Sequence, residues 1–204
     1  MYISPTNLPD EWSDIEGFIK KYNFATVITT LPNGEITATH LPVNVIHEDG
    51  KSILQGHVSK ANNQYASIID HDVLLIFMAG HHYISPSWYT HRNAPTWNYV
   101  SIHVHGKGKK LDGEKLIKHL DDLMNQHEQF VENPQRMEDI PENVLKVDLR
   151  GVLGFEIEIT KIEASYKLSQ NRDDVSYQNI IKNLETINSD NSNFIANEMK
   201  IRRP

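Results

Sequence analysis

The chain has 204 residues, of which 39% are hydrophobic, so it is long enough to bury one sizeable core. It contains no cysteine, which excludes disulfides, thiolate zinc sites, iron–sulfur clusters and a cysteine nucleophile. Its formal net charge of −7 opposes binding to nucleic acid, because such binding depends on Lys and Arg side chains that neutralise phosphates.

The first half of the chain predicts one amphipathic helix followed by antiparallel strands. Trp12, Ile15, Phe18 and Ile19 recur at helical spacing, and runs of β-branched residues follow them. Glycine-containing turns separate these runs, as hairpins require. The expected elements are a helix over 9–22, strands over 24–30, 35–46 and 52–58, and a short helix over 61–69.

The second half alternates strands with helices. A strand over 73–78 is apolar on both faces and is therefore expected to be central and buried. Residues 81–98 break all periodicity, and strands are expected again over 98–109 and 152–162. Helices are expected near 116–124, 144–149 and 180–187, whereas the Asn- and Ser-rich residues from 188 onward are expected to fray.

These elements predict a fold that is mainly β with helical additions (α+β), arranged as a small antiparallel barrel. Parallel strands would require a regular alternation of strands and helices, which is absent. We expect a single domain over 1–204 with a helical C-terminal extension from about residue 173. Neither a signal-peptide pattern nor a bilayer-spanning apolar run occurs, so we expect a cytoplasmic location away from membranes.

The irregular stretch contains a dense mixture of aromatic and polar groups. Tyr83–Tyr89 and Pro95–Tyr99 hold two of the chain's three tryptophans beside Ser, Thr and Asn. This mixture suits the stacking of a flat heteroaromatic ligand, with hydrogen bonds to its edges or to a phosphate. The alternative is a proline-stiffened loop whose aromatic side chains cover one end of the barrel. Both interpretations stay open on composition alone.

A second polar segment, Lys167–Arg172, follows the last expected strand. Two cations around Ser, Gln and Asn suit a phosphate, because Arg binds phosphate through two hydrogen bonds and hydroxyl and amide groups complete the shell. A solvated turn at the end of a strand is the alternative.

Histidines and strand ends form a third group of candidates. His103 and His105 lie two residues apart on an expected strand, so both could reach one metal ion or one ligand. No helical His-Glu-x-x-His pattern or carboxylate cluster accompanies them, and we expect no metal site. His40 and the segment Gly56–Asn62 place polar groups at strand ends, where a lysine supplies charge for a phosphate. Helix capping by a serine is the alternative for this segment.

Taken in chain order, a series of segments resembles the PaiB family over about residues 1–172. The segments are Phe24-Ala25-Thr26, Thr39-His40-Leu41-Pro42, Gly56-His57-Val58, Lys60-Ala61-Asn62, Tyr83–Tyr89, Pro95–Tyr99 and Lys167–Arg172. The resemblance implies an antiparallel FMN-binding split β-barrel related to pyridoxamine phosphate oxidase, with FMN as cofactor, a homodimer, and a role in negative transcriptional regulation. Between Tyr89 and Pro95 this chain is shorter than the family pattern, and Ala94 stands where valine is usual.

Through this resemblance, the polar and aromatic residues of the matching segments become candidate flavin-binding residues. They are His40, His57, Lys60, Asn62, Ser85, Ser87, Trp88, Tyr89, Thr96, Trp97, Asn98, His103, Lys167, Ser169, Gln170, Asn171 and Arg172.

Three function classes stay open. They are a flavin-binding negative transcriptional regulator, an FMN-dependent oxidoreductase of the pyridoxamine phosphate oxidase-like class, and a haem-binding or haem-degrading split barrel. In the oxidoreductase case FMN would supply the redox chemistry, and no residue identifies a substrate or a catalytic group. The chain has no helix-turn-helix with a basic recognition helix, so we expect no direct DNA binding and an indirect route for any regulation.

The expected barrel is too narrow to hold a flavin, because its interior is filled by its own side chains. The expected interior residues are Val27, Ile28, Leu74, Ile76, Ile102 and Val104. A flavin would therefore lie outside, where the wall of one barrel is too shallow to bury it. We expect two subunits related by a twofold axis to share each flavin site.

Overall fold

The computed structural model describes residues 1–7 and 11–203, and the chain forms two compact units. Unit 1 comprises Met1–Gly17, Phe77–His103 and Glu163–Pro204, and unit 2 comprises Phe18–Ile76 and Val104–Ile162. Each unit is therefore built from segments that lie far apart in the sequence. None of the described helices is long and apolar enough to cross a membrane.

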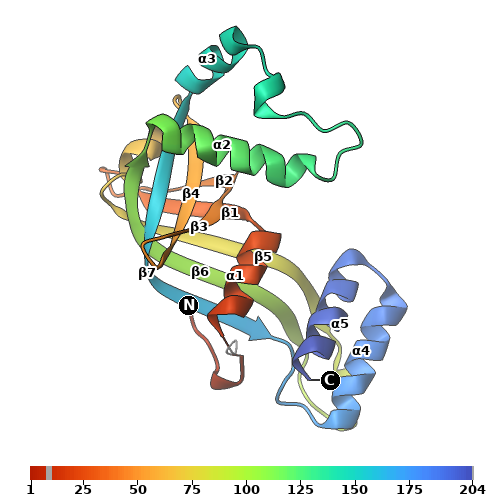
Figure 1. Cartoon of the computed structure of the whole chain (residues 1–204). Helices are drawn as coiled ribbons and strands as arrows, with labels where there is room; N and C mark the ends of the chain where they lie inside the picture. Colours follow the sequence, from red (N-terminus) through yellow and green to blue (C-terminus); the bar gives the residue numbers. More distant parts are fainter. Residues whose placement is uncertain (8–10, 204) are drawn as a thin grey trace. The chain divides into compact units, whose positions relative to one another are not determined.

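Unit 2 contains a seven-stranded sheet in the order β2-β1-β5-β6-β7-β4-β3 (Figure 1). The strands are β1 (Phe24–Thr30), β2 (Ile36–Pro42), β3 (Asn44–Glu48), β4 (Lys51–Ser59), β5 (Asp72–Ile84), β6 (Thr96–Leu111) and β7 (Val152–Lys167), the last three only in part. β1 pairs antiparallel with β2 and β5, and β4 pairs antiparallel with β3 and β7. The expected antiparallel, mainly β architecture is confirmed.

The two edge strands of this sheet are neighbours in the chain. β2 ends at Pro42 and β3 begins at Asn44, so Val43 alone separates them. Because one residue joins the two edges, the sheet has to curve until they meet, and it becomes a barrel. Val43 is buried, and its amide donates to the carbonyl of Asn23 at 3.0 Å where the pairing of β2 with β1 ends. The single strand expected over 35–46 is therefore two strands at opposite edges.

Burial alternates along the strands, which corrects the expected list of interior residues. On β1, Val27 is buried whereas Ile28 is only half-buried, because successive strand residues face opposite sides of the sheet. The remaining expected interior residues divide in the same way. Val104 of unit 2 and Ile102 of unit 1 are buried, while Leu74 and Ile76 are half-buried. Ile28, Leu74 and Ile76 thus belong to the outer wall.

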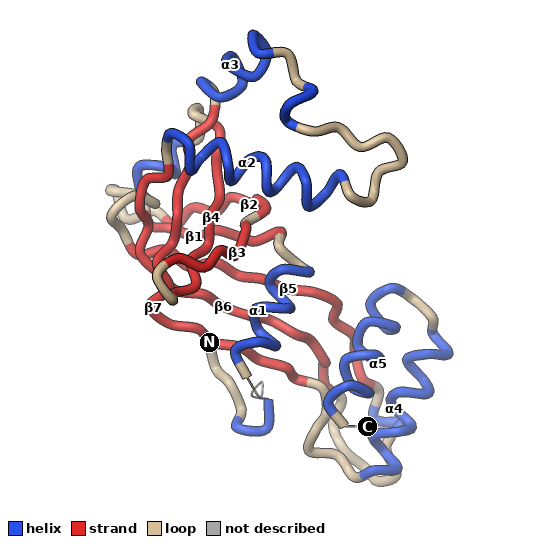
Figure 2. Tube along the Cα trace, in the orientation of Figure 1, coloured by secondary structure: helices blue, strands red, loops and turns tan. Residues whose placement is uncertain are grey.

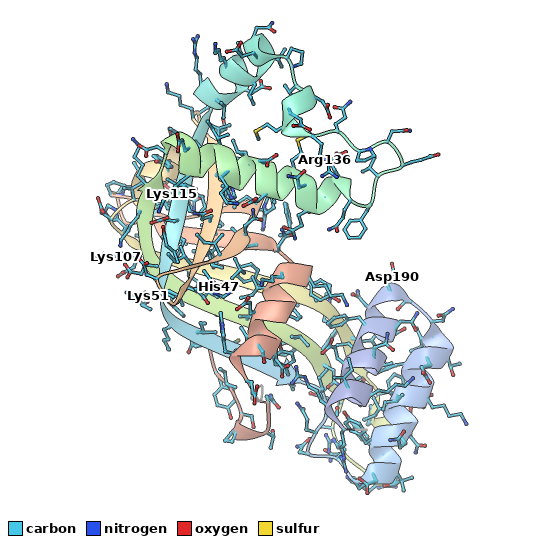
Figure 3. The ribbon with its side chains drawn as sticks, viewed as in Figure 1. His47, Lys51, Lys107, Lys115, Arg136 and Asp190 are labelled. Carbon is cyan, nitrogen blue, oxygen red and sulfur yellow. The ribbon has the colours of Figure 1, made fainter. Side chains whose placement is uncertain are left out.

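Helices interrupt the strands of unit 2. They are the 3-10 helices η2 (Asn63–Ser67) and η4 (Met137–Asp139), and the α-helices α2 (Gly113–Glu128) and α3 (Glu142–Arg150). The helices expected near 116–124 and 144–149 are confirmed, whereas the one expected over 61–69 is the shorter η2. Lys115 of α2 forms an ion pair with Glu48 at 2.7 Å, and Arg136 donates from Nη1 to Asn125 Oδ1 at 2.5 Å (Figure 3). The first contact links α2 to β3, and the second links α2 to the segment that follows it in the chain.

In unit 1, strand structure extends into the stretch that was expected to be irregular. β5 continues to Ile84 and β6 begins at Thr96, so the loop covers only 85–95 and contains the 3-10 helix η3 (Pro86–Trp88). Phe77 and Ile84 are both buried although their positions differ by an odd number of residues, so the alternation of faces is interrupted once. This interruption hides the strand from a search for period-two alternation.

The C-terminal part of unit 1 is a pair of helices, α4 (Asp174–Ile187) and α5 (Asp190–Arg202), which lie side by side (Figures 1 and 2). Ser189 caps α5, because its Oγ accepts a hydrogen bond from Ser192 N at 3.2 Å while Ser192 Oγ accepts one from Ser189 N at 2.9 Å. Ile195, Ala196 and Met199 of α5 are buried. The expected fraying from 188 onward is therefore wrong, since a cap and a buried stripe hold this helix.

The N-terminal helix α1 (Trp12–Lys21) is shorter than the helix expected over 9–22. Residues 8–10 lie outside the described residues, and the expectation cannot be compared with the structure there. Phe18 and Ile19 are buried as the helical spacing indicates.

Candidate functional site

An exposed group of rings lies on the strands of unit 1. Trp97 of β6 is 51% exposed, and its ring centroid lies 5.7 Å from that of His81 and 6.0 Å from that of Tyr83, both on β5. Tyr99 lies two residues after Trp97 on the same strand and therefore faces the same side. We call His81, Tyr83, Trp97 and Tyr99 the aromatic face. Of these four residues, only Trp97 is among the flavin-binding candidates predicted from the sequence.

A cation borders the aromatic face. The Lys167 Nζ atom lies 5.9 Å from the ring centroid of Tyr99, within the range of a cation–π contact. His103 lies further along β6 with the same strand parity as Trp97 and is half-buried. The candidates Trp97, His103 and Lys167 thus belong to one side of the unit 1 strands.

Two other candidates lie on the opposite side, beneath α5. Asn98 is fully buried, and its Oδ1 accepts a hydrogen bond from Ser169 Oγ at 3.0 Å. The Nδ2 atom of Asn98 donates to Met199 Sδ at 3.6 Å. Because successive residues of β6 face opposite sides, Asn98 and Trp97 cannot line the same surface. Asn98 therefore contacts α5 in this structure, and Ser169 contacts Asn98.

Several candidates in the loop between β5 and β6 form contacts within the loop or with β5. Ser85 caps η3, and its Oγ lies 2.8 Å from that of Ser87. The Trp88 ring stacks at 6.5 Å on His82, and Thr96 begins β6. These candidates lie in or next to the segment that joins β5 to β6.

The segment after β7 brings a second cation close to an aromatic ring. The Arg172 guanidinium lies 4.4 Å from the ring centroid of Tyr89, and both Arg172 Nε and Tyr89 OH are buried without a hydrogen-bond partner among the described residues. Gln170 is engaged locally, since its Oε1 accepts from Leu168 N at 2.8 Å, while Asn171 is exposed. Arg172 therefore has hydrogen-bonding capacity that the protein does not use.

The unit 2 candidates differ in how exposed their side chains are and in how many hydrogen bonds they form within the protein. His40 is exposed, with Nδ1 3.0 Å from Thr26 Oγ1, and Lys60 is exposed just after β4. Asn62 is engaged at both ends, because its Oδ1 caps η2 by accepting from Gln64 N at 2.9 Å and its Nδ2 donates to Thr39 Oγ1 at 3.0 Å. Of these three, His40 and Lys60 are the side chains open to a ligand.

His57 forms a pair that the sequence interpretation missed. Its Nδ1 lies 3.1 Å from Nε2 of His119, a fully buried residue of α2. Burial lowers the pKa of His57, and burial followed by the nearby His57 lowers the pKa of His119 from 6.5 to about 4. A histidine on the apolar side of an otherwise amphipathic helix was the available signal.

The histidine candidates do not make a metal centre in this structure. His103 and His105 lie two residues apart on β6 and have the same strand parity. Across residues 1–7 and 11–203, no cluster of three or more His, Asp or Glu side chains is arranged to hold a metal ion.

A groove of about 430 Å³ lies on unit 2 and is lined partly by the outer-wall residues Ile28 and Leu74, with His105 and Lys161. Its volume falls within the usual range for small-molecule pockets. It contains none of the candidate flavin-binding residues. The candidates therefore do not line this groove.

Comparison with known proteins identifies the family. The family model described as "Putative FMN-binding domain" matches residues 1–161. The chain is 34% identical over 200 residues to "Protease synthase and sporulation protein PAI 2" of Bacillus subtilis (strain 168), which covers 98% of this chain and 94% of the relative. The chain belongs to the PaiB family. A more distant relative, "Uncharacterized protein AN0679" of Emericella nidulans, is 25% identical over 183 residues, covering 74% of this chain and 73% of the relative.

Solved structures agree with the split-barrel fold of this PaiB-family chain. The FAD and haem binding protein from Mycobacterium smegmatis matches with a TM-score of 0.62 at 14% identity, covering 81% of this chain and 75% of that one. The flavocytochrome Anf3 from Azotobacter vinelandii matches with a TM-score of 0.60 at 13% identity, covering 82% and 73%. At these identities the likeness shows the fold alone.

Proposed function

We propose that this PaiB-family protein binds FMN with the isoalloxazine ring against the aromatic face of unit 1. Trp97 carries the proposal, because about half of this large side chain is exposed between the rings of His81 and Tyr83. A flavin stacked on these rings would bury apolar surface that is otherwise open to water. Membership of a family of FMN-binding domains supports flavin as the ligand.

Lys167 and Arg172 are the proposed partners of the FMN phosphate. Lys167 borders the aromatic face through Tyr99, and Arg172 has a buried Nε without a hydrogen-bond partner among the described residues. Charge-assisted hydrogen bonds to a phosphate are about twice as strong as neutral ones, and Arg suits them best. The phosphate preference distinguishes FMN from riboflavin.

Each flavin site is proposed to be shared between two copies of the chain in a homodimer. An open aromatic face covers only one side of a planar ring, whereas ligand pockets bury most of their ligand. His40 and Lys60 are exposed side chains of unit 2 that would line the other wall from the second copy. A twofold axis then creates two equivalent sites.

Mixing two variants tests the shared site. Trp97→Ala and Lys60→Ala should each weaken FMN binding in their own dimers. After subunit exchange in an equimolar mixture, about a quarter of all sites should regain both residues, because each mixed dimer has one intact site. FMN bound to the mixture is measured by equilibrium dialysis. No recovery in a mixture whose exchange is verified by mass spectrometry would overturn sharing.

We also propose that the protein acts in the cytoplasm as a negative regulator of transcription, and that its flavin-bound state exerts this effect. The Bacillus subtilis relative is named for protease synthesis and sporulation, which supports a regulatory function. The net charge of −7 disfavours contact with DNA phosphates, so the effect is proposed to be indirect.

The visible spectrum of freshly purified protein tests which cofactor the protein binds. Flavin bands are expected, and a haem Soret band without flavin would overturn the proposal.

A further inference from the structure

Within unit 2, a single hydrogen bond joins the side chains of His57 on β4 and His119 on α2. The Nδ1 atom of His57 lies 3.1 Å from Nε2 of His119, and the two ring centroids are 5.4 Å apart. The centroid distance exceeds the nitrogen distance by about the sum of the two ring radii, so the nitrogens point at each other almost in line. This is the geometry of an N–H···N hydrogen bond. Two histidines on one metal ion would instead direct their lone pairs to a common point at an angle.

The surroundings of His119 determine which nitrogen donates. His119 is fully buried, and its Nδ1 has no hydrogen-bond partner among the residues that the structure describes. If His57 were the donor, neutral His119 would carry its proton on Nδ1, leaving a buried N–H without an acceptor. Such N–H groups are rare, and each costs about 1–3 kcal/mol. With His119 Nε2 as donor, only a lone pair is left without a partner.

The donor assignment fixes the state of His57. Because Nδ1 of His57 accepts the hydrogen bond, neutral His57 carries its proton on Nε2. His57 is half-buried, and no hydrogen bond of its Nε2 to a described residue is found. Burial lowers the pKa of both histidines, so the pair is uncharged at neutral pH. His57 therefore offers an outward N–H group that is a donor and not a cation.

We infer that His119 is a positioning residue that locks His57 as a neutral Nε2–H donor, and that this donor binds an acceptor oxygen of FMN. For its ligand, the inference rests on the proposed function. His57 lies three residues before Lys60, which follows the end of the same strand and is exposed. FMN carries acceptor oxygens on its phosphate and on its ring, and comparison with riboflavin distinguishes the two sources.

The tautomer is tested directly by nitrogen NMR on the full-length protein labelled with 15N-histidine, without ligand. The His57→Ala and His119→Gln variants assign the signals. At pH 7, His57 should show a bare Nδ1 and a protonated Nε2, and His119 the same pattern. In His119→Leu, the His57 signals should move towards the averaged values of a solvent-exposed histidine. Averaged His57 signals in the unaltered protein, or a protonated Nδ1 on His119, would overturn the inference.

Ligand binding tests the role of the donor. His57→Ala should weaken FMN binding about tenfold, the value of a hydrogen bond to a charged or strongly polar acceptor. His119→Leu should weaken binding in the same direction, whereas His119→Gln should retain most of the affinity, because its amide keeps an N–H donor at similar reach. A purely structural role for His119 predicts no such rescue. Unchanged FMN affinity in His57→Ala would overturn the inference while leaving FMN binding itself established.

The NMR measurement and the comparison of FMN with riboflavin together distinguish a failure of this inference from a failure of the proposed function. A loss confined to FMN assigns the donor to the phosphate, and an equal loss for riboflavin assigns it to the ring; both outcomes support a ligand-facing donor. If the unaltered protein binds neither flavin, the proposed function fails and the ligand half of the inference fails with it. The NMR measurement still decides the His119–His57 lock in that case.

Discussion

Phe194 of α5 lies directly against Gly80 of β5, within unit 1. A Cβ atom added at position 80 would stand 2.6 Å from Phe194 Cδ1 and 2.8 Å from Cγ. Carbon atoms do not pack at such distances, so either the ring or the helix would have to shift. Because residue 80 has no side chain, Phe194 of α5 can pack directly against β5.

Gly80→Ala should lower the free energy of unfolding by about 1–3 kcal/mol, the usual range for overpacking. Urea denaturation monitored by circular dichroism measures it. The matched background is Phe194→Ala, which removes the two nearest ring atoms and leaves only the Cβ atom of residue 194, at 2.9 Å, so the cost of Gly80→Ala should be smaller there. An equal cost in both backgrounds would show that the ring does not rest on this glycine.

Acid should destabilise the protein through His119. Its folded pKa is lowered from 6.5 to about 4, mainly by burial, with a smaller contribution from His57 and a small opposing effect of Asp122. The unfolded chain therefore takes up a proton at higher pH than the folded protein. The free energy of unfolding falls as pH decreases from about 6.5 to about 4, by about 3 kcal/mol, and this contribution is constant below that range.

The measurement is urea unfolding at a series of pH values for the unaltered protein and for His119→Gln. The variant cannot titrate at this position, so its stability should fall less steeply between pH 6.5 and 4. His57, whose pKa is also lowered, acts in the same direction and is present in both proteins. Parallel pH curves would contradict the assignment to His119.

Lys167→Ala should weaken FMN binding about tenfold and riboflavin binding much less, because the lysine is proposed to meet the phosphate. Isothermal titration with both flavins gives the comparison. Lys182→Ala, which removes an exposed lysine of α4 in the same unit, is the matched control and should leave both affinities unchanged. Equal losses for the two flavins in Lys167→Ala would remove this residue from phosphate binding.

The isolated protein should not bind DNA sequence-specifically. Its net charge of −7 and the lack of a basic recognition helix in the sequence are the reasons. Footprinting on the promoter of a regulated gene at physiological salt is the test. A protected site that survives at that salt concentration would make direct regulation the leading account.

The sequence predicts most individual helices and strands, but it does not predict how these elements pair and pack with one another. β1 is readable because Phe24–Thr30 is rich in β-branched residues, and α2 because its apolar residues follow helical spacing. β2 pairs with β1 before it and β3 pairs with β4 after it, so the break at Val43 is a change of partner within one extended run that no glycine turn marks. An interruption in β5 likewise hid its extension to Ile84.

The candidate site was predictable in composition but not in arrangement. Trp97 and Asn98 are adjacent in sequence and share the same motif, yet one is exposed and the other lies beneath α5. Strand parity separates them, and parity can be assigned only when the strand itself is recognised. His119 was missed because its position on the apolar side of α2 does not indicate which residue it meets, and its partner His57 lies 62 residues away in the chain.

Titration with FMN, followed through tryptophan fluorescence and the visible flavin spectrum, tests the central claim most directly. The account predicts saturable quenching and a shifted flavin spectrum, because Trp97 would stack close to the isoalloxazine. Trp97→Leu should lose most of the quenching and bind FMN more weakly, whereas Trp12→Phe, which alters a tryptophan outside the aromatic face, should behave as the unaltered protein. Saturating FMN that changes neither the protein fluorescence nor the flavin spectrum would contradict the claim.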